Sequence, residues 1–549
     1  MKQSEDLNNN IISRVAMGDL LRRRAREAGD KEALVEFING QRVSLSYHEA
    51  NSRVNQLGRG LRNMGLQQGD RLALVSGNSI DFVMTLFACY KTGIVCVPIN
   101  FLQNPDDLRY NLEHSEVKAL VYQPELEALC CQCSEGLAEV KYKISMGNEI
   151  GAADTSLQQL CDSQSTDEIL DTFINDRDVA QILYTSGTTS RPKGVESSHL
   201  ALVLSSMTTP LNLDLKRGSP ALNVLPLFHI TALVGLLGCM QMSGAYVIHT
   251  GFDPSLVVET LEREKISFVV MLPMMWNACL AVPGMAARDY SALTAALYGM
   301  APMGSELLSK LRATFGCDFH LGSGQTEFTP MPCVFYDHSD TEFSEGNYWG
   351  VPTSMTEQAV LNDDGSECAQ GEMGEICWRG PQSMNGYLKN PEATAEVQSH
   401  GWHHSGDLGF IDKEGQLMFV DRKKDIVKTG GENVSSCKVE GIVSAIDGVA
   451  LSAVIGLPHP HWSEGICAVV QLMPDAQLSE TDIIAHCKNK LGKFEVPKAV
   501  VFVGALPLTG TGKVKKPELR KQYEGLFIDA DDTQSSSSSS SVAATSTAD

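Results

Sequence analysis

Two stretches of the chain share one arrangement, in which a short apolar run precedes a helix-like run and a second apolar run follows it. The first begins with RLALVS at Arg71, continues through a helix-like segment that opens near Asn78 and closes at Gly93, and ends in IVCVPIN. The second reads GAYVIHT, FDPSLVVETLEREK and ISFVVMLP, with Asp253 as the expected N-cap and Pro254 as the first helical residue. Such runs are typical of βαβ units. They predict an α/β fold, with a largely parallel sheet covered by helices.

Beyond about residue 420 the pattern changes to that of a smaller unit. A basic stretch, DRKKDIVKTGGENV, precedes helix-like SSCKVEGIVSAI, strand-like LSAVIGLP and ICAVVQLM, helix-like ETDIIAHCKNKLG and strand-like AVVFV. We therefore expect a large N-terminal domain over residues 1–421 and a small, mobile α+β C-terminal domain over residues 422–528. The serine-rich acidic tail, residues 529–549, contains too few apolar residues to fold, and we expect it to be disordered.

The composition narrows the choice of partners. A net charge of −23 over 549 residues argues against nucleic acid and against anionic membranes, because both bind exposed Lys and Arg. The uncharged run over residues 230–248 approaches the length of a membrane span, but its three glycines, Gln241 and Ser243 favour a buried helix and strand. The polar start, MKQSEDLNNN, lacks the pattern of a secretory signal, so we expect a cytoplasmic protein, a monomer or homodimer, without stable membrane insertion.

The cysteines favour a reducing compartment. Their number, 15, is odd, and they are scattered through a long chain rather than arranged as a disulfide framework. The densest group is Cys130, Cys131 and Cys133, which no Cys or His pair follows at zinc-finger spacing. We interpret these three as reduced surface thiols rather than as a metal site.

A polar loop, YTSGTTSRPKG, directly follows the apolar run VAQILY. A strand end followed by consecutive backbone N–H groups, one glycine and several hydroxyls is typical of a loop that wraps phosphate. It is not a Walker A loop, because Gly194 stands where that motif has Ser or Thr. Considered alone, the stretch is also compatible with a solvated turn. The candidate phosphate ligands are Thr185, Ser186, Gly187, Thr188, Thr189, Ser190 and Lys193.

Further motifs follow this loop along the chain. They are LPLFHIT with His229, LYGMAPMG, LGSGQTE, GWHHSGDLGFIDKEG with Asp407, VDRKKDIVKTGGENV with Arg422, and PLTGTGKVKK with Lys513. In this combination and order the chain resembles the adenylate-forming superfamily of acyl-CoA synthetases, adenylation domains and firefly-luciferase-like enzymes. The resemblance covers nearly the whole chain. It implies an AMP-forming acid–thiol ligase that uses ATP, Mg²⁺ and coenzyme A to convert a carboxylic acid to an acyl-adenylate and then to acyl-CoA, with AMP and pyrophosphate as the other products.

The resemblance also implies roles for individual residues in the first half-reaction. Lys513 matches the lysine that bridges the acid's carboxylate and the α-phosphate, and Glu327, preceded by Thr326, matches the carboxylate that holds Mg²⁺. Asp407 matches the acceptor for both ribose hydroxyls. Arg422 matches a neighbouring ligand of ribose and phosphate.

For the second half-reaction, the resemblance implies a rotation of the C-terminal domain about Lys424. That rotation would withdraw Lys513 and bring the segment from Lys428 to Gly431 against the tunnel for the pantetheine arm of CoA. His229 matches an aromatic gate between that tunnel and the acyl pocket.

The chain departs from the family pattern at two positions. Residues 298–302, which include Gly299 and Ala301, match the loop on one side of the adenine, but Ser323 replaces the aromatic residue that many relatives place before Gly324. Stacking from that position is lost, so base binding is weaker or supplied elsewhere. Lys438 stands where the family has Glu, which predicts altered contacts of domain closure.

Three functions remain open at this point, namely an acyl-CoA ligase, a luciferase-like oxidation of the acyl-adenylate, and a non-catalytic acyl- or nucleotide-binding relative. Amino-acid-activating relatives have Asp where this chain has His229, which argues against an amino acid substrate. The expected pocket wall is apolar and small, so we expect a fatty or aryl acid. That wall comprises Ile230, Thr231, Ala232, Gly235, Gly299, Gly322 and Met331.

Overall fold

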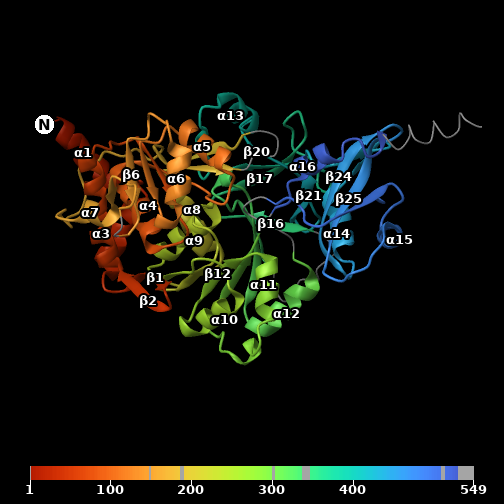
Figure 1. Ribbon diagram of the computed structural model, residues 1–549, viewed down its shortest axis with the longest axis horizontal. Helices are drawn as coiled ribbons and strands as arrows, with labels where there is room; N and C mark the ends of the chain where they lie inside the picture. Colours follow the sequence, from red (N-terminus) through yellow and green to blue (C-terminus); the bar gives the residue numbers. More distant parts are fainter. Residues whose placement is uncertain are drawn as a thin grey trace, which may run out of the picture.

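The structure is a computed structural model of the chain, and it describes residues 2–147, 150–185, 191–299, 303–336, 347–508 and 513–528. These residues form three sheets with helices between and around them (Figure 1). The smallest sheet, drawn in blue, lies at one end of the molecule, and the N-terminus lies at the opposite end.

The eight-stranded sheet is parallel from β8 to β7. It contains the first predicted βαβ unit, because β3 and β4 pair in parallel and α4 (Ile80–Thr92) connects them. In spatial order its strands are β19 (Gly386–Tyr387), β9 (Lys193–Ser198), β8 (Val179–Thr185), β4 (Val95–Pro98), β3 (Arg71–Val75), β5 (Ala119–Tyr122), β6 (Tyr142–Ser145) and β7 (Thr155–Ser156).

The thirteen-stranded sheet is parallel from β14 to β1 and antiparallel elsewhere, so the prediction of a largely parallel sheet holds for part of it and is wrong for the rest. Short hairpin connections build the antiparallel part. In order the strands are β17 (Glu357–Leu361), β18 (Gly374–Arg379), β20 (His403–Ile411), β21 (Leu417–Arg422), β16 (Tyr348–Pro352), β15 (Cys333–Tyr336), β14 (Asp318–Ser323), β13 (Ala295–Tyr298), β12 (Phe268–Met271), β10 (Ala221–Asn223), β11 (Tyr246–Ile248), β1 (Glu32–Ile38) and β2 (Gln41–Ser46).

The second predicted βαβ unit is confirmed in this sheet. α10 (Pro254–Arg263) connects β11 and β12, which lie on either side of β10. Asp253 is the N-cap, since its carboxylate accepts a hydrogen bond from the backbone N–H of Leu256 at 2.9 Å. The uncharged run over residues 230–248 forms α9 (Ile230–Gln241) and β11, as expected, and nearly every residue of α9 is buried. None of the described helices is both long and apolar enough to cross a bilayer.

The C-terminal body is a separate five-stranded sheet with its own apolar core. Its elements are the predicted helices and strands in the predicted order, with two further strands before them and one further helix after them. They are β22 (Val427–Thr429), β23 (Glu432–Val434), α14 (Ser436–Ser444), β24 (Val449–His459), β25 (Ser463–Leu472), α15 (Glu480–Lys490), β26 (Ala499–Val503) and α16 (Lys516–Gln522). The chain leaves the thirteen-stranded sheet at Arg422 and enters this one at Val427. The domain boundary after residue 421 remains a prediction, and the tail over residues 529–549 lies outside the described residues.

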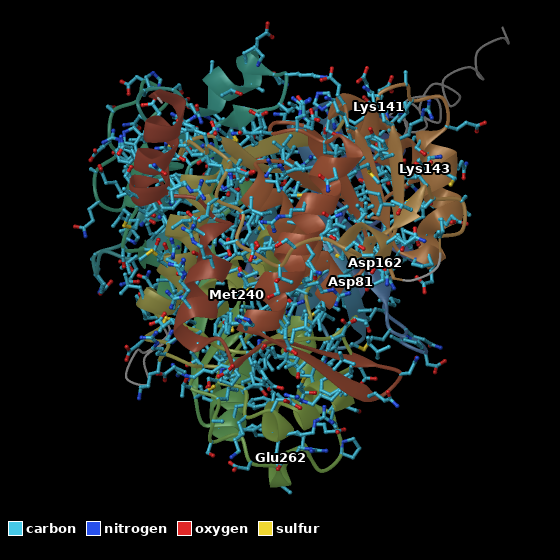
Figure 2. The ribbon with its side chains drawn as sticks, turned by 90° about the vertical axis from the view of Figure 1, so that its left-hand side faces the viewer. Asp81, Lys141, Lys143, Asp162, Met240 and Glu262 are labelled. Carbon is cyan, nitrogen blue, oxygen red and sulfur yellow. The ribbon has the colours of Figure 1, made fainter. Side chains whose placement is uncertain are left out.

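The other helices cover the faces and ends of the two larger sheets. They are α1 (Lys2–Ser13), α2 (Asp19–Ala28), α3 (Tyr47–Met64), α5 (Pro105–His114), α6 (Glu127–Ser134), α7 (Leu157–Cys161), α8 (His199–Asn212), α11 (Pro273–Leu280), α12 (Ser305–Phe315) and α13 (Pro391–Val397). Figure 2 looks onto the end opposite the C-terminal body, with Lys141 and Lys143 in its upper part and Glu262 of α10 at the bottom.

The expectation of surface thiols at residues 130–133 is wrong for two of the three cysteines. Cys130 and Cys133 are 0% and 2% exposed, because α6 turns them into the core beside α5 and the eight-stranded sheet. Burial raises the pKa of the Cys130 thiol to about 12.

Candidate active site

A cavity of about 550 Å³ lies where the thirteen-stranded sheet meets the C-terminal body. It has a charged end and an apolar end. Asp407, Arg422 and Lys513 line the charged end, and residues of α8, α9 and the parallel strands line the apolar end. Three residues that the sequence assigned to an ATP site, far apart in the chain, therefore meet in one space.

Asp407 and Arg422 come from β20 and β21, which pair residue against residue at this point. Their side chains approach within 3.7 Å, Arg422 Nε to Asp407 Oδ1. Burial raises the pKa of Asp407 to about 6, and the neighbouring cations Arg422 and Lys513 oppose that rise. A carboxylate and a guanidinium held this close can accept hydroxyls and bind an anion side by side.

Lys513 enters the cavity from the C-terminal body. Lys513 lines the cavity and keeps solvent-accessible surface there. Burial and the charge of Arg422 lower the pKa of Lys513, whereas Asp407 and Glu327 raise it. The structure thus brings Lys513 near both carboxylates that the sequence assigned to the nucleotide and its metal.

His229 precedes α9 as its N-cap residue, and its ring lies against that of Phe228, with centroids 4.7 Å apart. Burial and the charge of Lys513 lower the pKa of His229 to about 4, so its imidazole is neutral at pH 7. Among the described residues, its buried Nε2 has no hydrogen-bond partner. A neutral ring beside Lys513 is compatible with the predicted gate and does not test it.

Glu327 lies in a short 3₁₀ turn, Thr326–Phe328. Its Oε1 accepts a hydrogen bond from the Tyr387 hydroxyl at 2.9 Å, and Lys193 Nζ lies 4.7 Å from the centre of the Tyr387 ring. Tyr387 therefore links the end of the predicted phosphate loop to the predicted metal ligand. The described residues hold no cluster of three or more His, Cys, Asp or Glu able to bind a metal. A single carboxylate near a phosphate site fits Mg²⁺, which takes few protein ligands and completes its shell with phosphate and water.

The tip of the predicted phosphate loop lies outside the described residues. Thr185 and Lys193 pair across the β8–β9 hairpin and bracket that tip. The assigned residues Ser186, Gly187, Thr188, Thr189 and Ser190 fall within it, as does Ala301 within the adenine-side loop.

At the apolar end, two of the predicted glycines are required by close packing. A Cβ on Gly299 would lie 2.8 Å from the carbonyl oxygen of Gly322, and one on Gly322 would lie 2.9 Å from Met331 Sδ. Thr231, Gly235 and Met331 also line the cavity as expected. Ile230 and Ala232 do not belong to this wall, because α9 turns both away from it into the core.

Two residues assigned to the CoA step lie outside the cavity. Lys428 of β22 is exposed, and its backbone N–H donates to Glu464 Oε2 at 2.6 Å. Gly431 forms the turn between β22 and β23 with φ +87°. The structure therefore presents one face of the C-terminal body, the Lys513 face, to the cavity.

The departure at Lys438 leaves its helix intact. Lys438 lies in the first turn of α14, and its Nζ lies 2.6 Å from Glu495 Oε1 of the same body. Glu440, two residues further along the same helix, pairs with Lys516 at 2.7 Å. In this arrangement Lys438 makes a contact within the C-terminal body rather than one of domain closure.

Sequence reasoning missed two aromatic residues of the cavity, Trp349 of β16 and Phe419 of β21. Their rings stack with centroids 4.6 Å apart and an interplanar angle of 9°. The one signal in the sequence is the position of Phe419, three residues before Arg422 in MFVDR.

Comparison with known proteins agrees with this geometry. The AMP-binding enzyme family matches residues 21–388, and the AMP-binding enzyme C-terminal domain matches residues 438–513. The chain is 35% identical over 483 residues to a feruloyl-CoA synthase of Amycolatopsis sp, covering 88% of this chain and 94% of that one. It is 30% identical over 511 residues to a long-chain-fatty-acid–CoA ligase of Mycobacterium tuberculosis, covering 92% and 98%.

A solved structure with the same fold is ATP-bound MatB from Rhodopseudomonas palustris, with a TM-score of 0.83 at 27% identity, covering 93% of this chain and 99% of that one. The expected fold, reaction class and use of ATP and CoA are thereby confirmed. The chain belongs to the AMP-binding enzyme family and is an acid–thiol ligase of the adenylate-forming type.

Proposed function

We propose that this ligase activates an aryl carboxylic acid at the junction of the two ends of its cavity and then transfers the acyl group to CoA. The observation that carries the proposal is the continuity of one cavity from Asp407, Arg422 and Lys513 to the apolar wall on α9. An acid whose ring lies on that wall would direct its carboxylate toward Lys513.

In the first half-reaction, a carboxylate oxygen of the acid attacks the α-phosphorus of ATP and pyrophosphate leaves. Both reactants are anions, and Lys513 is a cation at the charged end of the cavity, which is continuous with the apolar end. At about 4 Å and an effective dielectric near 20, one such contact contributes on the order of 4 kcal/mol before solvation is counted. Asp407 would accept the ribose hydroxyls, Arg422 would bind beside them, and Gly299 and Thr326 would flank the nucleotide.

Glu327 would hold Mg²⁺ on the phosphates, where the ion would neutralise charge on the leaving pyrophosphate. Tyr387 supports this role by fixing one oxygen of the Glu327 carboxylate, which leaves the other for a ligand. Lys193 Nζ lies over the Tyr387 ring and would add positive charge beside the same phosphates.

In the second half-reaction, the thiolate of CoA attacks the acyl carbon and AMP leaves. The Lys513 face occupies the cavity in this structure, so the thiol needs another arrangement of the C-terminal body. We propose a rotation about Lys424 that exchanges Lys513 for the turn between Lys428 and Gly431, with His229 at the entrance for the thiol.

The shape of the apolar end supports an aryl acid. The wall follows α9 from Thr231 to Gly235, which is about 6 Å at 1.5 Å per residue. At Gly238, one turn further on, α8 and α9 close on each other, because an added Cβ would lie 3.2 Å from the backbone oxygen of Ser206. A ring fits this depth better than a long chain. The relative that forms feruloyl-CoA points to the same class of acid.

A panel of acids tests the proposal. Pyrophosphate release is measured with benzoate, ferulate, octanoate and palmitate, each with and without CoA. We expect the aromatic acids to support release and CoA to yield their thioesters. A preference for palmitate would favour the second candidate, a fatty acid, which the mycobacterial relative motivates. Release without any thioester would contradict the ligase assignment, and light emission on adding oxygen would indicate the luciferase-like alternative.

A further inference from the structure

A strained residue, Thr329, follows the turn that carries Glu327. Its φ is +41°, in the left-handed region that glycine favours and that a β-branched residue rarely adopts. Thr329 lies two residues after Glu327 and two residues before Met331, which lines the cavity. The strained residue therefore joins the proposed metal ligand to the cavity wall.

Two buried hydrogen bonds hold Thr329 in this conformation. The Ser205 hydroxyl of α8 donates to Thr329 Oγ1 at 2.9 Å, and the Thr329 hydroxyl donates to the backbone oxygen of Gln382 at 2.5 Å. Ser205, Thr329 and Gln382 are each 2% exposed, so these bonds are shielded from solvent. A strained residue persists only where surrounding contacts over-determine its conformation, and these two bonds are such contacts.

The turn around Glu327 is short and closed. A Cβ on Gly324 would clash with the backbone oxygen of Pro330, so the two ends of the turn lie against each other. Between them, the backbone oxygen of Glu327 accepts a hydrogen bond from the N–H of Met384 at 2.9 Å. In so short a turn, a change of backbone conformation at Thr329 alters the direction in which the Glu327 side chain points.

The helix that anchors Thr329 is also part of the cavity. Thr209 of α8 lines the cavity, and it lies four residues after Ser205, which places both on one face of the helix. Ser205 therefore ties the turn of Glu327 to the same element that forms part of the cavity wall.

We propose that Thr329 and Ser205 are positioning residues for the half-reaction with ATP, because their hydroxyls hold the left-handed backbone that directs the Glu327 carboxylate. The inference rests on the proposed function in one respect, the binding of Mg²⁺ by Glu327. Tyr387 holds one oxygen of that carboxylate at 2.9 Å, so a shift of the turn would break this bond or withdraw the other oxygen. Loss of a residue that orients a metal ligand typically lowers metal affinity or activity by about ten- to hundredfold.

The test measures ATP binding with and without Mg²⁺. Dissociation constants are obtained by calorimetry on the full chain, without acid or CoA, so that no adenylate forms. Thr329→Val keeps the β-branched shape but loses both hydrogen bonds. We expect this variant to bind ATP about tenfold more weakly when Mg²⁺ is present and as before when it is absent. Thr329→Ser keeps the hydroxyl and should bind as the full chain does.

The variant Thr329→Gly separates positioning from packing. Glycine adopts a φ of +41° without strain, so its backbone depends less on the two hydrogen bonds. With Mg²⁺ present, Thr329→Gly should therefore bind ATP more tightly than Thr329→Val does. A role in packing alone predicts the opposite order, because glycine leaves the larger cavity.

A second pair of variants tests the anchor on α8. Ser205→Ala should weaken ATP binding less than Thr329→Val, and again only with Mg²⁺, because the bond from Thr329 to Gln382 remains. The matched control is Thr208→Val. It removes a buried hydroxyl of the same helix that donates to the backbone oxygen of Leu204 at 2.9 Å, and it should leave both dissociation constants unchanged.

Three results for Thr329→Val would overturn the positioning role and leave the proposed function standing. They are unchanged ATP binding, an equal loss with and without Mg²⁺, and tighter binding than in Thr329→Gly. The variant Glu327→Gln tests the proposed function itself and should lose the effect of Mg²⁺ on ATP affinity. If Mg²⁺ strengthens ATP binding to Glu327→Gln as much as to the full chain, the assignment of Glu327 is wrong, and the positioning role with it.

Discussion

The C-terminal body has two faces that carry functional candidates, and they differ in their surroundings. The Lys513 face packs on the thirteen-stranded sheet, where burial lowers the pKa of Lys513 and two carboxylates lie nearby. The opposite candidate face, the turn from Lys428 to Gly431, is exposed and has no protein within 4 Å of the position of a Cβ on Gly431. The first face is the one that we propose for the reaction with ATP, and the second has open space around its turn.

The difference between the two faces indicates that this arrangement of the C-terminal body serves only the half-reaction with ATP. Lys513, which lies between β26 and α16, and the Gly431 turn, which joins β22 and β23, belong to one C-terminal body, and in this arrangement Lys513 but not Gly431 lines the cavity. Variants that change one face at a time therefore test whether the two faces serve different half-reactions.

The largest expected effect is that of Lys513→Ala. Acid-dependent pyrophosphate release should fall by on the order of 10²–10³, because the cation between two anions is lost. Thioester formation from supplied acyl-adenylate should stay nearly unchanged. The matched control is Lys515→Ala, which removes an exposed lysine paired with Glu518 at 2.8 Å and should affect neither step. If Lys513→Ala slowed pyrophosphate release and thioester formation equally, the prediction that the two faces serve different half-reactions would be wrong.

The next effect concerns the exposed face, through Gly431→Ala. A side chain at φ +87° strains the turn by roughly 1–2 kcal/mol and narrows it, so thioester formation should slow by about tenfold or more while pyrophosphate release persists. Gly415→Ala is the control, since Gly415 has φ +80°, equally open surroundings and a position in the β20–β21 turn. If both variants slow the thioester step alike, the exposed face has no specific role.

The third prediction uses the pKa of about 6 for Asp407 on the Lys513 face. Because burial raises this pKa above the ordinary value, the free protein holds the proton more tightly than the unfolded chain does. The ribose hydroxyls need the ionised carboxylate, so adenosine should bind best above pH 6 and lose up to about tenfold per pH unit below it. Adenosine is the probe because it carries no titrating phosphate. Calorimetry from pH 5 to 8 measures the effect, which should be absent in Asp407→Asn.

The smallest effect is expected at Lys438, whose side chain is 55% exposed. Lys438→Glu would face Glu495 with a like charge and should lower the free energy of unfolding by less than about 1 kcal/mol in urea, with both half-reactions unchanged. The variant Lys438→Gln removes the ion pair with Glu495 without adding a like charge, so it separates the loss of the pair from the repulsion between two carboxylates. A large change in either half-reaction would show that this residue does take part in domain closure.

The elements of the fold were largely predictable because they depend on local patterns. The order of helices and strands from α14 to β26 and both βαβ units follow from apolar periodicity and from caps such as Asp253. The antiparallel part of the large sheet was missed, since its strands, among them β16 and β21, come from short runs without a connecting helix. Ile230 and Ala232 were misplaced because periodicity shows which residues of α9 are apolar, not which of its buried faces meets the cavity.

The sequence by itself determined the family and predicted Lys513, Glu327, Asp407 and Arg422 as site residues, because each motif is a short contiguous stretch. Only the tertiary structure decided that Lys513 and not Lys428 lines the cavity, and that Trp349 and Phe419 stack in its wall. Those outcomes depend on how the sheets pack against one another and on the one-residue register shifts between β16 and β21 and between β20 and β21. Such register shifts are set by contacts between distant strands, and no local pattern encodes them.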